Sequence, residues 1–179
     1  MRRALAAILF CLPLAAAAQA VDEKRDFGVP PSTELRLAGH ASPTPLTVPG
    51  AQVIATAELR ARLEEPLETR PLLFDVLGED AHLTIPGAIW LPGAGRGSSF
   101  EDEVQARLAK LLDFATRGDR RRPLVFFCSG PECWLSYNAA LRAVRLGYGE
   151  VRWYRGGLEA WRAASAPLAQ PRVRWKEGR

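Results

Sequence analysis

The sequence predicts one α/β domain, with a five-stranded, mainly parallel sheet and helices on both of its faces. Its 179 residues suffice for a single compact domain with an extension and are too few for two full domains. Short apolar runs of strand length alternate with longer stretches of helical apolar spacing, which is the pattern of parallel strands joined by crossover helices. Residues 123–127 are apolar throughout, as in a strand that helices cover on both faces.

The predicted elements follow from local signals. Thr56 is suited to cap the N-terminus of the first helix. Gly147 is suited to end the third helix, because glycine accepts the left-handed conformation of a C-cap. The helix that begins near Phe100 repeats apolar residues at helical spacing. In chain order the elements are a strand at 52–54, a helix at 56–65, strands at 72–76 and 88–91, a helix at 100–116, a strand at 123–127, a helix at 136–146, a strand at 151–154 and a helix around Trp161.

The first 20 residues have the three parts of a cleavable export signal. Residues 1–3 give a positive start, residues 4–17 form an apolar run, and 18–20 (Ala-Gln-Ala) are a small-x-small cleavage site. A permanent membrane anchor needs about 20 apolar residues, and this run is shorter and interrupted by proline. We therefore expect cleavage after Ala20, a mature periplasmic chain and no membrane anchor.

The composition sets the remaining organisation. Residues 21–50 hold five prolines and no sustained apolar period, so we expect an irregular extension, followed by a domain at 51–170 and a solvated basic tail at 171–179.

The formal charge of +4 falls to +2 without the two arginines of the signal, because 22 basic residues then face 20 acidic ones. That scattered surplus does not indicate nucleic-acid binding. His40 and His82 have no metal-ligand spacing, so no metal is predicted.

The chemistry concentrates at Cys128, the first residue after the most apolar strand. In a parallel sheet, ligands bind beyond the carboxyl ends of the strands. The next loop leads into a helix, so its backbone N–H groups and the helix N-terminus would stabilise a thiolate. Cys133 is the other cysteine that remains after signal removal, and its pairing with Cys128 is an open question in an oxidising compartment. The alternative for Cys128 is a small buried hydrophobic residue.

Four ordered motifs resemble the rhodanese-like domain over about residues 51–168. They are a strand followed by Asp75-Val76, the stretch Ile85-Pro86-Gly87-Ala88, Cys128 at the catalytic position, and a C-terminal signature of Gly147-Tyr148, Val151, Gly156-Gly157 and Ala160-Trp161. The resemblance implies a sulfurtransferase fold in which Cys128 carries a persulfide in a cradle of loop amides. The substrate-binding loop that it implies consists of Ser129, Gly130, Pro131, Glu132, Trp134 and Leu135.

A narrower resemblance comes from the extension, from the stretches Asp75-Val76-Leu77 and Ile85-Pro86-Gly87, and from residues 133–140 (Cys-Trp-Leu-Ser-Tyr-Asn-Ala-Ala). These look like an exported subfamily named for its Cys-x-x-Cys-Trp motif and associated with pyrroloquinoline-quinone-dependent alcohol oxidation. It implies quinone-dependent dehydrogenases or c-type cytochromes as partners and a small thiol or sulfane-sulfur substrate. The spacing departs from the motif, because four residues separate Cys128 from Cys133.

The loop also departs from ordinary rhodaneses, because it is longer and holds no cation. Glu132 instead adds a negative charge, which is expected to raise the thiol pKa and to repel thiosulfate. Leu77 stands where many family members have Arg, and Thr84 where the family has His. Arg96 and Arg155 are candidates for the missing cation, although a solvated surface position is the default for both.

Asp75 and Ser136 are expected to support the site. Asp75 either orients the loop or caps the turn at the end of its strand, and Trp134 either covers the sulfur or packs ahead of the helix. His82 lies in a polar loop and is expected to be exposed rather than catalytic.

Three functions remain open. Cys128 passes on a sulfane sulfur, or Cys128 and Cys133 cycle as a thiol redox pair, or the fold is a non-catalytic binding module with a structural disulfide. We predict a reducible pair in which Cys128 is the more acidic thiol and Cys133 is the resolving partner.

Overall fold

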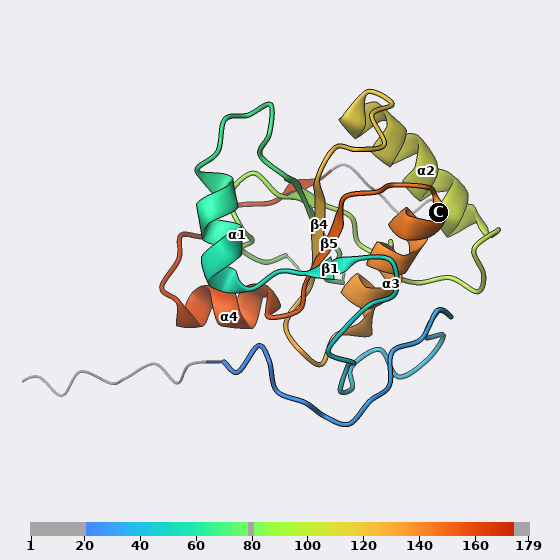
Figure 1. Cartoon of the computed structure of the whole chain (residues 1–179), viewed down its shortest axis with the longest axis horizontal. Helices are drawn as coiled ribbons and strands as arrows, with labels where there is room; N and C mark the ends of the chain where they lie inside the picture. Colours follow the sequence, from blue (N-terminus) through green and yellow to red (C-terminus); the bar gives the residue numbers. More distant parts are fainter. Residues whose placement is uncertain (1–20, 79–80, 174–179) are drawn as a thin grey trace, which may run out of the picture.

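The structure, a computed structural model, describes residues 21–78 and 81–173 and forms a sheet between two layers of helices (Figure 1). The predicted signal and the end of the basic tail lie outside the described residues. The strands lie in the order β1-β5-β4-β2-β3-β6, and every neighbouring pair is parallel. Their bounds are β1 Gln52–Val53, β2 Leu72–Asp75, β3 Ile89–Trp90, β4 Leu124–Phe127, β5 Val151–Tyr154 and β6 Arg172–Val173.

The predicted α/β class and its five strands are confirmed. The sheet has one strand more than expected, because β6 pairs with β3 at the edge. Residues 172–173 of the expected tail are therefore part of the sheet.

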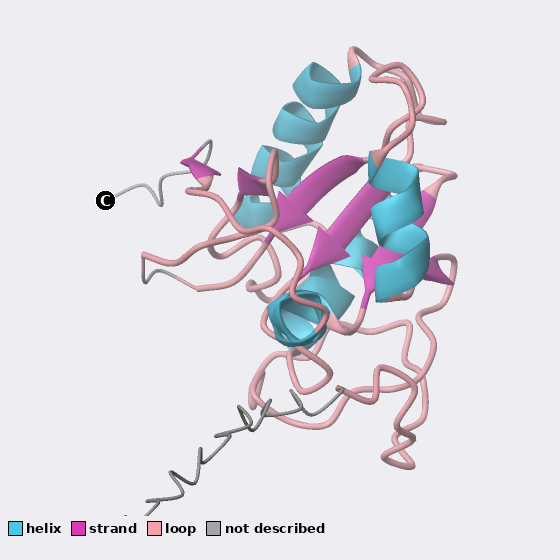
Figure 2. Ribbon diagram, turned by 90° about the vertical axis from the view of Figure 1, so that its left-hand side faces the viewer, coloured by secondary structure: helices cyan, strands magenta, loops and turns pink. Residues whose placement is uncertain are grey.

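Helices cover both faces of the sheet (Figures 1 and 2). The bounds are α1 Thr56–Leu63, α2 Glu103–Thr116, α3 Trp134–Arg145 and α4 Gly157–Ala163. The central strand β4 is buried at every residue, as predicted from its composition. Phe126 packs into the core beneath α2 and α3 with Leu108, whereas Phe127 packs beneath α1 and α4 with Leu59 and Leu158. Successive side chains of a strand point to opposite faces, so one strand serves both cores.

Gly147 ends α3 as predicted. Its φ of 83° is left-handed, and its N–H and that of Tyr148 donate to the carbonyls of Val144 and Ala143. This pair of hydrogen bonds satisfies carbonyls that the end of a helix otherwise leaves free.

The predicted cap of α1 is wrong. Thr56 is the first helical residue, and Ala55 is the N-cap without a side-chain hydrogen bond. The carboxylate of Glu23 accepts the N–H of Thr56 at 3.0 Å instead. A distant residue therefore satisfies this helix end, which is why the local sequence did not reveal it.

Residues 21–50, named the arm below, lie against the domain along the lower side of Figure 1. The arm makes isolated antiparallel bridges at Ala41, with Cys133, and at Val48, with Ala51. In the described part of the chain, no helix is long and apolar enough to cross a membrane.

Candidate functional site

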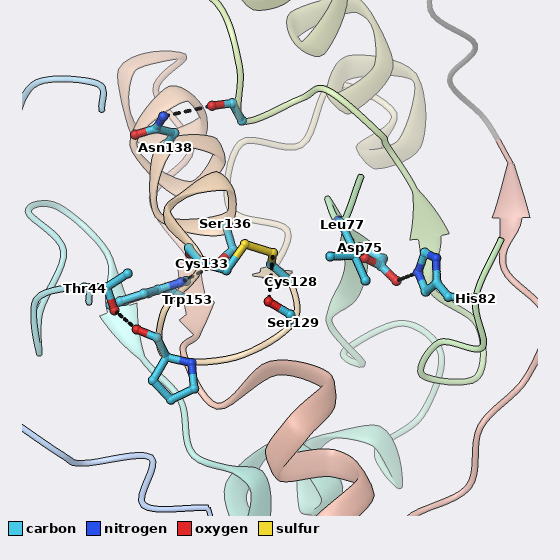
Figure 3. The surroundings of a disulfide bond; sticks show 12 residues. Thr44, Asp75, Leu77, His82, Cys128, Ser129, Cys133, Ser136, Asn138 and Trp153 are labelled. Atoms are coloured by element: carbon cyan, nitrogen blue, oxygen red, sulfur yellow. Dashed lines mark hydrogen bonds and ion pairs between the residues drawn. A yellow bond between two sulfur atoms is a disulfide. The ribbon is translucent and has the colours of Figure 1, made fainter. Parts of the chain in front are cut away.

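Cys128 follows β4 directly and is joined by a disulfide to Cys133, the N-cap residue of α3 (Figure 3). The Cα atoms of the two cysteines lie 6.2 Å apart, within the range that a disulfide spans. Only 1% of Cys128 and 6% of Cys133 are exposed. The carboxyl edge of the sheet therefore holds a buried disulfide that links the central strand to the start of a helix.

The disulfide loop, residues 128–133, is held on one side by α4. Two N–H groups at the start of α4 donate to the carbonyls of Cys128 and Ser129, at 3.0 and 2.8 Å. A Cβ on Gly157 would lie 2.5 Å from the carbonyl oxygen of Cys128, and the φ of Gly157 is +57°. Only glycine fits this position without a shift of the backbone. The second glycine of the Gly-Gly pair is thus explained by its contact with the loop.

Residues 40–44 of the arm, named the strap, lie against the second half of the loop. Ser42 donates its N–H to the carbonyl of Glu132 at 2.9 Å, and Thr44 donates its N–H (3.2 Å) and its hydroxyl (2.6 Å) to the carbonyl of Pro131. The first N–H of α3 donates to a carbonyl of the strap at 2.9 Å. That N–H group therefore bonds to the strap, whereas the sequence led us to expect it in a cradle for sulfur.

Ser136 and Trp134 support the start of α3. The Ser136 hydroxyl donates to the carbonyl of Cys133 (3.2 Å) and accepts a hydrogen bond from the indole of Trp153 (2.9 Å). Trp134 is buried and donates its indole N–H to the carbonyl of Pro43 at 3.0 Å. Trp134 thus packs beneath the arm as the first residue of α3, a place that neither of the two expected roles described.

Asn138, which sequence reasoning missed, fastens two segments to α3. Its amide donates at 2.8 Å to the carbonyls of Gly95 and Arg36, and its oxygen accepts the N–H of Arg36 at 2.9 Å. A Cβ on Gly95 would collide with the carbonyl of the buried Leu135. The glycine-containing loop at residues 93–97 has no side chain at Gly95, because it packs there directly on the backbone of α3.

Asp75 ends β2 with its side chain fully buried. One carboxylate oxygen accepts the N–H of Leu77 (2.9 Å), and the other accepts the hydroxyl of Thr84 (2.5 Å) and lies 2.8 Å from Nε2 of His82. Asp75 therefore caps the turn after its strand, as one of its two expected roles required. The expectation of an exposed His82 is wrong, because its side chain is only 11% exposed and packs edge-on against Trp90.

Arg155 and Arg96 were the two candidates for the cation that the loop lacks. Arg155 is 1% exposed and donates to the carbonyls of Glu23 (2.8 Å) and Thr44 (3.1 Å). Burial lowers its pKa. Arg155 thus anchors the arm, contrary to the default of a solvated surface position, and Arg96 is exposed as that default required.

Two exposed carboxylates mark the disulfide loop: Glu132 belongs to the loop, and Glu159 of α4 lies against it. A Cβ on Gly130 would collide with the carboxylate of Glu159. Partial burial raises the pKa of Glu159, and the negative charge of Glu132 raises it further. The rim of the loop is therefore negative, through Glu132 as expected and through Glu159, which sequence reasoning missed.

A buried ion pair behind the site was also missed. Arg142 of α3 donates to both carboxylate oxygens of Asp102, at 3.1 and 2.9 Å. Asp102 is the N-cap of α2 and accepts the N–H of Gln105 at 2.8 Å. Burial alone would raise the pKa of Asp102, but the bonds from Arg142 and from backbone N–H groups lower it to about 2. The Asp-x-x-Gln spacing signals the cap, but it does not reveal the arginine.

Hollows open on the surface away from the cysteines. One of about 1220 Å³ lies along α2 beside the exposed Phe114, and another of about 640 Å³ lies between α1 and Trp161. Both are lined by Leu72 and Ile89, the first residues of β2 and β3. These hollows therefore lie at the amino ends of the strands, and neither is lined by Cys128 or Cys133.

The chain matches the profile of the Rhodanese-like domain over residues 55–164. It belongs to the rhodanese-like domain family. A solved thiosulfate sulfurtransferase from Pseudomonas aeruginosa is 21% identical with a TM-score of 0.50, over 72% of this chain and 22% of that chain. A full-length protein from Lactobacillus plantarum is 20% identical with a TM-score of 0.50, over 66% of this chain and 87% of that chain. A protein from Bacillus halodurans is 23% identical with a TM-score of 0.50, over 67% of this chain and 77% of that chain.

The predicted resemblance to the rhodanese-like domain is thus confirmed. No curated protein matches the chain. At these identities the likeness to solved structures establishes the fold of this rhodanese-like chain.

Proposed function

We propose that this rhodanese-like protein works through the opening and closing of its Cys128–Cys133 disulfide. Cys128 carries the transferred sulfur or a mixed disulfide, and Cys133 is the resolving thiol. The disulfide itself supports this proposal, because it joins the residue at the carboxyl end of the central strand to a helix N-cap. Its sequence separation is 5 residues, so its entropic stabilisation is about 2 kcal/mol on the chain-entropy model. A purely structural role is poorly motivated by that gain.

The opening step is thiol–disulfide exchange. A thiolate attacks Sγ of Cys128, the bond between the two sulfurs breaks, and the electron pair leaves with Cys133, which then takes up a proton. Cys133 is the better leaving group, because the N-terminus of α3 stabilises its thiolate. This revises our expectation from the sequence, in which Cys128 was the more acidic thiol. To close the cycle, Cys133 attacks Cys128 and expels the bound thiol.

The same bond supports one transfer of sulfur from hydrosulfide, with the disulfide as the oxidant, and an external disulfide such as oxidised glutathione then closes the pair by exchange before the next transfer. Hydrosulfide that attacks Cys128 leaves a persulfide there and a thiol on Cys133, so the disulfide itself is reduced as the sulfide is oxidised. An acceptor thiolate then takes the outer sulfur and leaves the Cys128 thiolate. If no acceptor comes, Cys133 attacks the inner sulfur, restores the disulfide and releases hydrosulfide. When the pair is open, a sulfane-sulfur compound can instead give its outer sulfur to the Cys128 thiolate and leave as a thiolate, so the proposed substrate is a small thiol or a sulfane-sulfur compound.

Location and partners form the rest of the proposal. The signal pattern of residues 1–20 supports export to the periplasm, where oxidising conditions favour a closed pair. Residues 133–140 support membership of the Cys-x-x-Cys-Trp subfamily. Through it we propose service to quinone-dependent alcohol oxidation, with a dehydrogenase or a c-type cytochrome as partner.

A non-catalytic binding module with a structural disulfide is the second candidate. The burial of both cysteines favours it, because exchange requires access to a sulfur atom. In that case the bond stays closed in the folded protein whatever thiol is offered.

The deciding measurement is the intact mass of the mature protein after equilibration in glutathione buffers of increasing reducing power and trapping with iodoacetamide. We expect the pair to open while the protein stays folded and to close again on oxidation. A glutathione adduct should accumulate on Cys128 in Cys133→Ser, and Cys128→Ser should lack it. In the single variants, Cys133 should alkylate at lower pH than Cys128. A pair that opens only on unfolding supports the binding module instead.

Thiosulfate:cyanide transfer is expected to be weak even after reduction. Glu132 and Glu159 repel a dianion at the loop, by about 1 kcal/mol for each close pair in high dielectric. The double variant Glu132→Gln/Glu159→Gln removes both repulsions, about 2 kcal/mol together, and should therefore raise kcat/KM for thiosulfate about thirtyfold. Steady-state assays of reduced protein test this, with the exposed Glu101→Gln as control. Rapid turnover by the wild type, unchanged in the double variant, would contradict it.

A further inference from the structure

The strap and the disulfide act on the same short stretch of chain. The strap hydrogen-bonds to the carbonyls of Pro131 and Glu132 and to the first N–H of α3. Between these contacts, Ala41 makes an antiparallel bridge with Cys133 itself. The strap therefore holds the loop in the curl that brings Cys133 to Cys128.

Arg155 anchors the strap from behind. Its Nε donates to the hydroxyl of Thr44 and another guanidinium nitrogen donates to the carbonyl of Thr44, both at 3.1 Å. The same hydroxyl donates to the carbonyl of Pro131, two residues before Cys133 in the loop, at 2.6 Å (Figure 3). Because the buried Arg155 would be costly to leave unpaired, these bonds fix the position of Thr44.

Reduction separates the two sulfurs, and the strap holds the backbone on either side of one of them, Cys133. Bonded sulfurs lie about 2 Å apart, whereas non-bonded heavy atoms prefer about 3.5–4.0 Å. Cys128 is fixed by the buried strand β4 and by α4, which bonds to its carbonyl. The displacement therefore falls on Cys133 and the start of α3, to which the strap bonds. Binding of the strap and closure of the disulfide consequently favour each other.

We propose that the strap binds the oxidised loop more tightly than the reduced loop, and that Thr44, held by Arg155, is the positioning residue through which the arm sets the reduction potential of the Cys128–Cys133 pair. By linkage, the strap makes the disulfide harder to reduce, and reduction loosens the strap. Loosening also uncovers one side of the loop for the next thiol. This inference rests on the proposed function only in that the disulfide opens reversibly.

The first test is the reduction potential in glutathione buffers of Thr44→Val, which removes the hydroxyl that links Arg155 to Pro131. We expect the disulfide of this variant to be about tenfold more easily reduced, a rise of about 30 mV for a two-electron couple. Thr44→Ser, which keeps the hydroxyl, and Thr47→Val, at an exposed position of the arm, should stay within twofold of the wild type. Equal potentials for Thr44→Val and the wild type would overturn the inference.

The second test does not need the wild-type bond to open. Amide hydrogen exchange at Ser42 and Trp134 is compared between the wild type and the double variant Cys128→Ser/Cys133→Ser. We expect exchange at least tenfold faster in the double variant, with the amide of Leu73 in the central sheet unchanged. Equal rates at Ser42 and Trp134 would overturn the inference. Faster exchange together with a wild-type disulfide that no thiol opens would support the coupling and reject the proposed function.

Discussion

Replacing Asp102 with Asn is expected to lower the free energy of unfolding by about 3 kcal/mol. Removal of one partner from a buried ion pair costs about 3–5 kcal/mol, because the other charge stays buried and unpaired. The side chain of Arg142 is fully buried and that of Asp102 is 14% exposed, so we expect the low end of that range. Asn caps helices about as well as Asp, so the loss measures the pair with Arg142 and leaves the cap of α2 in place.

Chemical denaturation of the oxidised protein measures this loss. Asp113→Asn is the matched control, because its ion pair with Arg120 is exposed and such pairs contribute at most about 1 kcal/mol. The pKa of Asp102 is lowered from 3.8 to about 2. Its contribution to stability is therefore complete above pH 4 and is lost as the pH falls toward 2, and Asp102→Asn should be less sensitive over that window. Equal stability losses in the two variants would contradict a role for the buried pair.

The sheet and helices could be predicted because their signals are local. The apolar run at 123–127 became β4, and Gly147 ends α3 as its neighbours required. The sixth strand could not be predicted, because Arg172–Val173 has no strand pattern and pairs only where β3 leaves an edge open. The cap of α1 was missed for the same reason, since Glu23 comes from far earlier in the chain.

The position of the site in the fold could be predicted from the sequence, whereas several of its contacts could not. Cys128 and its loop follow from the position of a cysteine after a buried strand, a rule that needs no distant partner. From the sequence, Arg155 was expected at the surface. Its hydrogen-bond acceptors lie in the arm, more than a hundred positions away in sequence, so no local pattern reveals them. His82 was misjudged for a different reason: its partner Asp75 is near in sequence, but the sequence does not show that tertiary packing buries Asp75. Irregular segments such as the arm give no periodic signal from which such contacts could be inferred.

The second large effect is expected for Gly157→Ala. A Cβ on Gly157 would lie 2.5 Å from the carbonyl oxygen of Cys128 and 2.8 Å from the backbone nitrogen of Gly130. Both atoms belong to the backbone of the disulfide loop, so no side-chain rotation relieves the collision. Overpacking of this kind costs about 1–3 kcal/mol, and the left-handed φ of +57° adds about 1 kcal/mol for a residue with a Cβ. We therefore expect a loss of about 2–4 kcal/mol.

Gly147→Ala separates the collision from the backbone strain. Gly147 has a φ of +83°, but a Cβ there would meet nothing within 4 Å, so only the left-handed penalty of about 1 kcal/mol applies. If α4 holds the disulfide loop in place, Gly157→Ala should also shift the loop and expose a sulfur. Glutathione should then open the disulfide of Gly157→Ala faster than that of Gly147→Ala, when both are compared under folding conditions. Similar stability and similar exchange rates in the two variants would show that the contact between α4 and the loop does not constrain the cysteines.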